Sequence, residues 1–169
     1  MKKNANISLV GFMGAGKTVV SQKLASMFQR ERVSTDDLIV KKEKREISDI
    51  FRDEGEAYFR EKEKEVIESL KEQSGLVIDC GGGVVLRDEN IANLKQNGAL
   101  IYLSASPDVI FERVKDETHR PLLNVSDPKA KIEKLLNDRM PFYQKADHTL
   151  DTNNKTVDDI CQEIVELIS

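Results

Sequence analysis

"ISLVGFMGAGKT", residues 7–18, joins a short apolar run to a glycine-rich segment that ends in Lys17 and Thr18. The apolar run is typical of a buried strand, and apolar residues then recur at helical spacing as far as Phe28. Gly11–Thr18 fits the pattern G-x-x-x-x-G-K-[ST] at every position. Because the pattern lies between an expected strand and an expected helix, it predicts a phosphate-binding loop in an α/β fold.

Each residue of this P-loop has an expected role. Glycine allows consecutive backbone N–H groups to turn toward phosphate oxygens, and the helix N-terminus that follows favours negative charge. Lys17 is expected to reach the β- and γ-phosphates and to assist catalysis, while the Thr18 hydroxyl is expected to bind Mg²⁺. The chain is therefore predicted to bind a nucleoside triphosphate through Gly14, Ala15, Gly16, Lys17, Thr18 and Val19.

The rest of the sequence alternates short apolar runs with helical patterns. Gly55 is expected to separate two helices within the charged but periodic segment 37–72. Other helices are expected between further strands near residues 32–34, 76–80, 99–103 and 148–152. This alternation predicts a three-layer α/β fold with helices on both faces of a parallel sheet. Ligands then collect at the carboxyl ends of the strands.

Composition limits the possible partners. The 169 residues suit one compact domain, and the 33% of charged residues carry a formal net charge of −4. Such a chain has no general attraction for nucleic acid or for an anionic membrane. Cys80 and Cys161 lack metal-ligand or disulfide-framework spacing, and the sequence has no pattern of a signal peptide or membrane span. We therefore expect a soluble cytoplasmic protein that binds neither nucleic acid nor membrane.

Two other classes of P-loop protein fit less well than a small kinase. The segment DCGG, residues 79–82, matches the D-x-x-G of guanine-nucleotide switches, but Asp158 lies one residue too far from Asn154 for N-K-x-D. A large ATPase does not fit a chain of this length. A kinase for a small molecule or nucleotide requires an acceptor pocket opposite the P-loop and a basic lid that excludes water.

The segment STDD, residues 34–37, offers a catalytic carboxylate. Asp36 ends an expected strand and would lie beside the phosphates if the first two strands are near neighbours. A carboxylate there can accept the proton of an attacking hydroxyl. Alternatively, Asp36 or Asp37 is the N-cap of a helix over residues 38–44. We favour the catalytic role for Asp36 and the N-cap role for Asp37.

Two arginines are expected to face inward. Arg139 shares a helix face with apolar residues that precede it by seven, four and three positions, and Arg60 stands seven before Ile67. Buried guanidinium groups bind planar anions in a bidentate manner. A substrate carboxylate would satisfy both arginines, and so would structural partners such as Glu56 or Asp138.

Arg120 lies in the loop segment HRPLL, residues 119–123. An arginine in a mobile loop can close over a phosphoryl group during its transfer, which gives Arg120 a candidate catalytic role. The alternative is an ordinary solvated loop arginine.

The motifs GFMGAGKT, STDD, DIFRDEGEAYFRE, CGGG, RPLL and RMPFY occur in this order. In that order and spacing the chain resembles shikimate kinases over nearly its whole length. The resemblance implies a nucleoside-monophosphate-kinase-like P-loop NTPase fold with a central five-stranded parallel sheet. It further implies a single kinase domain over residues 1–169, with substrate-binding helices at about 37–73 and a lid loop at about 114–128, and we expect a monomer.

The resemblance also implies a reaction and roles for residues. The reaction is transfer of the γ-phosphate of ATP to the 3-hydroxyl of shikimate, in aromatic amino-acid biosynthesis. Arg120 is then a lid residue that contacts the phosphates, and Arg113 and Lys155 lie where the family holds adenine. The residues implied to bind shikimate are Asp36, Arg60, Gly81, Gly82, Gly83 and Arg139.

One position departs from the family pattern. Shikimate kinases usually end the second strand with D-x-D, and here Ser34 replaces the first aspartate, which helps to hold Mg²⁺. Asp79 stands two residues before the glycines, where many other P-loop enzymes carry the aspartate that steadies the metal. We hypothesise that the metal's carboxylate has moved from the second strand to the third. Alternatively, Asp79 makes only local hydrogen bonds and Thr18 alone anchors Mg²⁺.

Two rival functions follow from these departures and from the shared P-loop. One is a related kinase with another acceptor, such as gluconate or a nucleotide. The other is a homologue that binds ATP without transferring phosphate, which the serine at position 34 makes conceivable.

Overall fold

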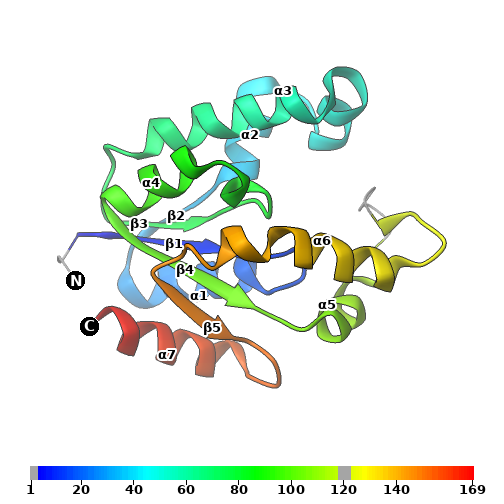
Figure 1. Cartoon of the computed structure of the whole chain (residues 1–169). Helices are drawn as coiled ribbons and strands as arrows, with labels where there is room; N and C mark the ends of the chain where they lie inside the picture. Colours follow the sequence, from blue (N-terminus) through cyan, green and yellow to red (C-terminus); the bar gives the residue numbers. More distant parts are fainter. Residues whose placement is uncertain (1–3, 118–122) are drawn as a thin grey trace.

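The computed structural model describes residues 4–117 and 123–169 and confirms the three-layer α/β architecture (Figure 1). Five parallel strands form one sheet in the order β2-β3-β1-β4-β5. Each strand lies within one residue, at either end, of the range that the sequence predicts. The strands are β1 (Asn6–Val10), β2 (Glu31–Ser34), β3 (Leu76–Asp79), β4 (Gly98–Ser104) and β5 (His148–Asp151).

The strand order decides which side chains can meet. The first two strands do not pair, because β3 lies between β1 and β2. On one side Leu9 is the register partner of Asp79, and on the other side Ser34 is. Asp79 therefore ends its strand between the P-loop and the STDD segment.

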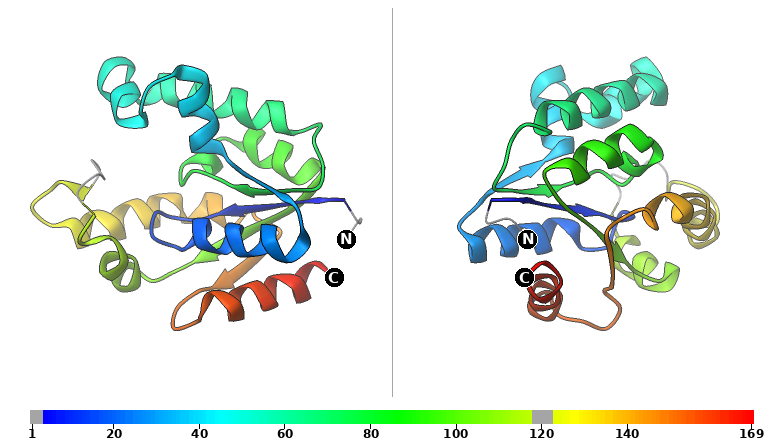
Figure 2. Two further views of the ribbon diagram at one scale, coloured as in Figure 1. Left: turned by 180° about the vertical axis from the view of Figure 1, so that it is seen from behind. Right: turned by 60° about the vertical axis from the view of Figure 1, so that its left-hand side comes forward.

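Helices cover both faces of the sheet (Figures 1 and 2). On one face α1 and α7 pack against the inward side chains of the strands, with Leu24 and Ile164 fully buried. On the other face lie α3, α4 and α6, with Ile67, Leu94 and Ile132 in the core. The helices are α1 (Lys17–Phe28), α2 (Thr35–Glu43), α3 (Ile47–Leu70), α4 (Asp88–Gln96), α5 (Pro107–Val114), α6 (Pro128–Tyr143) and α7 (Val157–Ile168). None of the helices in the described ranges combines the length and apolarity that a membrane crossing requires.

The alternation of side chains along each strand explains the two cores. In β4, Leu100 and Tyr102 face one layer of helices, while Ile101 and Leu103 face the other. All four are at most 2% exposed. A parallel sheet that is buried on both faces requires such continuous apolar runs.

The segment 37–72 contains the predicted break at Gly55. There the backbone of α3 adopts φ 83° and ψ 174°, which is not helical, and hydrogen bonding continues on both sides. Glycine adopts a positive φ without the steric cost that a side chain imposes. The second half of α3, which carries Arg60, is thereby redirected relative to the first.

The start of α2 differs from both N-cap alternatives. The helix begins at Thr35 rather than at Leu38, and the Ser34 hydroxyl accepts a hydrogen bond of 3.2 Å from the Asp37 amide. The prediction of Asp36 or Asp37 as N-cap is therefore wrong, because a serine one turn earlier takes that role. Both carboxylates lie in the first turn of α2, where they are not needed to begin the helix.

Candidate active site

A cavity of about 550 Å³ opens at the carboxyl ends of the central strands. The P-loop, the first turn of α2 and the segment that follows β3 all contribute to its walls. Its lining includes Lys17, Thr18, Asp36, Asp79, Gly81 and Arg113. The fold therefore brings the P-loop together with Asp36, Gly81 and Gly82 of the predicted acceptor site, whereas Arg60, Gly83 and Arg139 do not line this cavity.

The P-loop has the backbone that its glycines make possible. Gly14 and Gly16 have φ of 75° and 95°, and a Cβ atom on Gly14 would lie 2.7 Å from a methyl group of Val114. Lys17 begins α1, and its ammonium donates hydrogen bonds to the carbonyls of Gly11 (2.8 Å) and Phe12 (3.0 Å). The lysine thus folds back along the loop and lines the cavity.

Thr18 and Asp79 meet at the next edge of the cavity. The Thr18 hydroxyl donates a 2.9 Å hydrogen bond to Asp79 Oδ2. The Asp79 side chain is only 8% exposed, and the same oxygen accepts a 2.5 Å hydrogen bond from Arg32 Nη2. The two residues that the sequence predicts at a metal are therefore in direct contact.

Sequence reasoning missed Arg32. It stands two residues before Ser34 on β2, so both side chains lie on the same face of the strand. The available signal in the sequence was the alternation of a basic residue, Arg32, with a small one, Ser34, at the end of the strand. The separation of 47 residues between Arg32 and Asp79 hid the pairing until the strand order was known.

The glycine triplet lies against charged side chains. A Cβ atom on Gly81 would be 2.6 Å from Asp36 Oδ1 and 3.2 Å from Glu63 Oε2. On Gly83 it would collide with the Arg60 guanidinium, whereas on Gly82 its nearest neighbour is Arg139 Nη1 at 3.4 Å. A side chain at Gly81 or Gly83 would therefore displace the Asp36 carboxylate or the Arg60 guanidinium from its present position.

Two further residues that the sequence analysis missed fix the triplet in place. The Thr35 hydroxyl accepts a hydrogen bond of 2.9 Å from the Gly81 amide. The Tyr143 hydroxyl donates one of 2.7 Å to the Gly82 carbonyl, and burial raises the pKa of this tyrosine to about 12. Tyr143 therefore remains a neutral donor. Both contacts join positions 46 and 61 residues apart, which no local pattern reveals.

The two predicted arginines reach the same region from α3 and α6. Arg60 donates to Glu63 Oε1 at 2.9 Å and lies 3.3 Å from Glu56 Oε1, so the structural partner expected for it is real. Asp138 does not serve Arg139, because its carboxylate pairs with Lys134 at 2.8 Å. The guanidinium of Arg139 lies over the Phe12 ring, 5.6 Å from its centroid, and the residue is 8% exposed.

Glu63 is the least expected member of the site. It is 1% exposed, and its Oε2 has no hydrogen-bond partner among the described residues; the same is true of Asp36 Oδ1. Burial raises the pKa of Glu63 to about 7 and also raises that of Asp36. Glu63 follows Phe59 by four residues on the apolar stripe of α3, a spacing that could have marked it as buried.

Replacing Glu63 by glutamine should change how stability depends on pH. The folded pKa of about 7 exceeds the reference value of 4.5, so between these values the folded state binds the proton more tightly. The contribution of Glu63 to the free energy of unfolding therefore falls as pH rises through this window. Glu63→Gln is expected to remove a decline of up to about 1.4 kcal/mol per pH unit.

Urea denaturation at pH 5, 6 and 7 measures this slope. Glu68→Gln, which alters a half-exposed carboxylate at the end of the same helix, is the matched control and should leave the slope unchanged. An identical slope for wild type and Glu63→Gln would show that Glu63 is ionised throughout this range.

Of the two residues predicted to hold adenine, Arg113 lines the cavity and Lys155 does not. Arg113 donates to the carbonyls of Gly14 (3.0 Å) and Thr152 (3.4 Å), which ties the P-loop to the segment after β5. The Lys155 ammonium instead pairs with Glu163 on α7 at 2.7 Å. Arg120 lies outside the described residues, as does the part of the predicted lid over residues 118–122, so the role of Arg120 stays a prediction.

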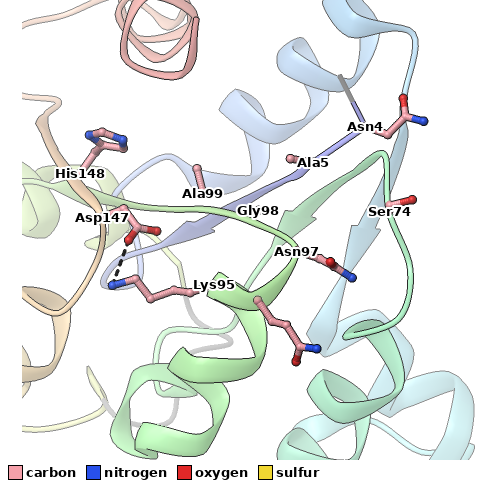
Figure 3. Close-up of a pocket in the computed structure, with 10 residues that line it drawn as sticks. Asn4, Ala5, Ser74, Lys95, Asn97, Gly98, Ala99, Asp147 and His148 are labelled. Atoms are coloured by element: carbon pink, nitrogen blue, oxygen red, sulfur yellow. Dashed lines mark ion pairs between the residues drawn. The ribbon is translucent and has the colours of Figure 1, made fainter. Parts of the chain in front are cut away.

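A second cavity, of about 430 Å³, lies at the opposite ends of the strands (Figure 3). Its charged groups already have structural partners. Lys95 pairs with Asp147 at 2.9 Å, and Asp147 also accepts a hydrogen bond from the Leu100 amide. These contacts join α4 to β4 and to the turn before β5, and they leave the cavity at the P-loop as the candidate active site.

Comparison with known proteins agrees with this geometry. The sequence model of a family described as "Shikimate kinase" matches residues 13–169. The chain belongs to the shikimate kinase family. Shikimate kinases are ATP-dependent kinases with a P-loop fold of the nucleoside-monophosphate-kinase type, so the predicted fold and enzyme class are confirmed.

Individual shikimate kinases match over almost their whole length. That of Thermodesulfovibrio yellowstonii is 45% identical, over 95% of this chain and 93% of the relative. That of Caldanaerobacter subterraneus is 41% identical, over 95% and 94%. The solved structure of the Acinetobacter baumannii shikimate kinase in complex with shikimate superposes with a TM-score of 0.92, at 39% identity over 97% of this chain and 92% of that one.

Proposed function

We propose that this chain transfers the γ-phosphate of ATP to the 3-hydroxyl of shikimate, with Asp36 as the carboxylate that orients and deprotonates the hydroxyl. One observation carries the proposal. A buried oxygen of Asp36, which has no hydrogen-bond partner within residues 4–117 and 123–169, lies beside a bare glycine backbone in the cavity that Lys17 also lines. A buried polar atom of this kind requires a partner, and a substrate hydroxyl supplies one.

Each charged group has a part in the proposed reaction. Lys17 and the P-loop amides neutralise the charge that spreads over the γ-phosphoryl oxygens, and Arg60 and Arg139 hold the substrate carboxylate. Asp36 accepts the hydroxyl proton as the new oxygen–phosphorus bond forms and the bond to the β-phosphate oxygen breaks. The protein forms no covalent bond to substrate, so positioning and electrostatics supply most of the rate enhancement.

The residues present fit a magnesium ion that is bound mainly through nucleotide. Mg²⁺ prefers oxygen ligands, keeps several waters and commonly takes only one or two groups from the protein. Thr18 and Asp79 offer a hydroxyl and a carboxylate 2.9 Å apart. Among the described residues, no three or more His, Cys, Asp or Glu side chains are grouped so that they could hold a metal ion. When bound, the ion would neutralise phosphate charge, with Thr18 and Asp79 holding it directly or through water.

The test of the function is ADP release from MgATP in a coupled assay, with and without shikimate. We expect release that depends on shikimate and is absent with gluconate or nucleoside monophosphates. Release with one of those acceptors alone would assign the kinase another substrate. ATP binding without shikimate-dependent release would favour the non-catalytic alternative.

Removing Arg139 should weaken the binding of shikimate and spare that of ATP. Truncating one partner of a buried charge pair typically costs 2–5 kcal/mol, so Arg139→Ala is expected to raise the KM for shikimate by about 30-fold or more. Steady-state kinetics with each substrate varied measures the two KM values. Lys134→Ala, which removes an exposed charge from the same helix, is the matched control. An equal rise in the KM for ATP would contradict the assigned role.

A further inference from the structure

Arg32 belongs to a closed ring of hydrogen bonds at the metal edge of the cavity. Its Nη2 donates to Asp79 Oδ2 at 2.5 Å, and its Nε donates to the Ser21 hydroxyl at 2.7 Å. Ser21 donates to the Thr18 carbonyl at 2.8 Å, and the Thr18 hydroxyl returns to Asp79 Oδ2 at 2.9 Å. The guanidinium is therefore held from two of its nitrogens, and the ring joins α1, β2 and β3.

The cavity around this ring carries one more carboxylate than cation. It is lined by four carboxylates, Asp36, Asp37, Asp79 and Glu117, and by three cations, Lys17, Arg32 and Arg113. Arg32 is the one of these cations that forms an ion pair with Asp79 among the described residues. Without a positive charge beside it, a carboxylate with 8% exposure would repel the phosphates of a nucleotide.

Arg32 lies on the same face of β2 as the serine that departs from the family pattern. Ser34 is the register partner of Asp79, and its short side chain contributes no charge. Arg32 stands two residues earlier on the same face of β2, and its long side chain reaches past Val77, its own register partner, to Asp79. One carboxylate and one guanidinium thus occupy an edge where the family pattern has an aspartate on β2.

We propose that Arg32 is a built-in counter-ion of Asp79, which shares this carboxylate with the divalent cation and so reduces the dependence of nucleotide binding on that cation. The inference rests on the proposed place of Asp79 beside the metal. Arg32 attracts the phosphates and neutralises Asp79 when no divalent cation is present, and it competes for Asp79 when one is. Losing Arg32 should weaken nucleotide binding in the absence of the cation and should free Asp79 for the cation when it is present. Both changes make nucleotide binding more dependent on Mg²⁺.

Calorimetric titration of ADP into the full chain, once in excess EDTA and once in saturating Mg²⁺, gives two dissociation constants. Arg32→Met, which keeps the length of the side chain but not its charge, is expected to raise the EDTA-to-Mg²⁺ ratio of these constants about tenfold. Arg32→Lys keeps the charge and loses the planar fork, so its ratio should stay within about threefold of wild type. Thermal melting of each variant verifies that it is folded.

Arg30→Met is the matched control. Arg30 precedes β2 at the other end of the strand, donates to the Ala5 carbonyl at 2.7 Å and does not line the cavity. Its loss removes the same net charge from the protein and should leave the ratio unchanged.

The outcomes separate this inference from the function on which it rests. An unchanged or lowered ratio in Arg32→Met overturns the counter-ion role, as does an equal change in Arg32→Lys. If at the same time Asp79→Asn abolishes the effect of Mg²⁺ on ADP binding, the metal site stands and only the inference fails. In the Asp79→Asn background, Arg32→Met should weaken the binding of ADP in EDTA, because the guanidinium then faces the phosphates without its carboxylate.

Discussion

Replacing Asp36 by asparagine is expected to lower kcat by about 10²–10⁴-fold, the usual contribution of a positioned general base. The substitution keeps the shape of the side chain and removes its ability to take a proton. Shikimate and ATP should still bind, because Arg60, Arg139 and the P-loop are untouched. Single-turnover kinetics at saturating substrates isolates this step.

The pH profile of kcat/KM gives an independent check on Asp36. Burial raises the pKa of Asp36 above its ordinary value, with Asp79 adding to the rise and Lys17 opposing it. The ionised form accepts the proton, so activity should rise as pH rises through this pKa and then level off. The acid limb of the profile should disappear in Asp36→Asn.

Asp37 provides the matched control, since it is the same residue type in the same turn of α2. Asp37→Asn should change kcat by less than about threefold, which is below the range of general-base losses. A large loss in Asp37→Asn together with near-normal turnover in Asp36→Asn would reverse the assignment made here.

The features of the site that the sequence predicts are determined by residues close together in the chain, whereas the missed features depend on residues far apart. The P-loop motif specifies the backbone around Gly14 and the start of α1, because both depend on neighbouring residues. The inward faces of Arg60 and Arg139 follow from helical periodicity. Each of these features is encoded within about two turns of helix.

The missed residues depend on contacts between distant segments. Arg32 reaches Asp79 only because β2 pairs with β3, and Tyr143 reaches the Gly82 carbonyl only because α6 lies against the glycine triplet. Glu63 was not singled out within the charged segment of α3, although its spacing from Phe59 indicated burial. Periodicity shows which way a side chain faces, but it does not identify what it meets. The N-cap of α2 was missed for another reason, because four polar residues in succession all suit that position.

Replacing Asp79 by asparagine should lower kcat/KM by about 10²–10³-fold, in line with the loss of one charged contact to a transferring group. The Thr18 hydroxyl would keep a hydrogen-bond partner in the amide oxygen, so the fold should be preserved. What is lost is the negative charge at the proposed metal site. The binding of ADP should therefore gain less from Mg²⁺ in this variant than in wild type, as titration in EDTA and in Mg²⁺ measures.

A second variant tests whether the carboxylate must stand at position 79 on β3 or can equally stand at the neighbouring position 34 on β2. Ser34 is the register partner of Asp79, and parallel strands lie about 4.8 Å apart, so Ser34→Asp returns a carboxylate to nearly the same place. Aspartate caps a helix as well as serine does, so α2 should still begin correctly. The double variant Asp79→Asn with Ser34→Asp is expected to recover at least about tenfold of the lost activity, in proportion to the charge it restores. If Asp79→Asn alone keeps normal turnover and a normal Mg²⁺ requirement, Thr18 anchors the ion unaided and Asp79 only completes the hydrogen bonds of the ring.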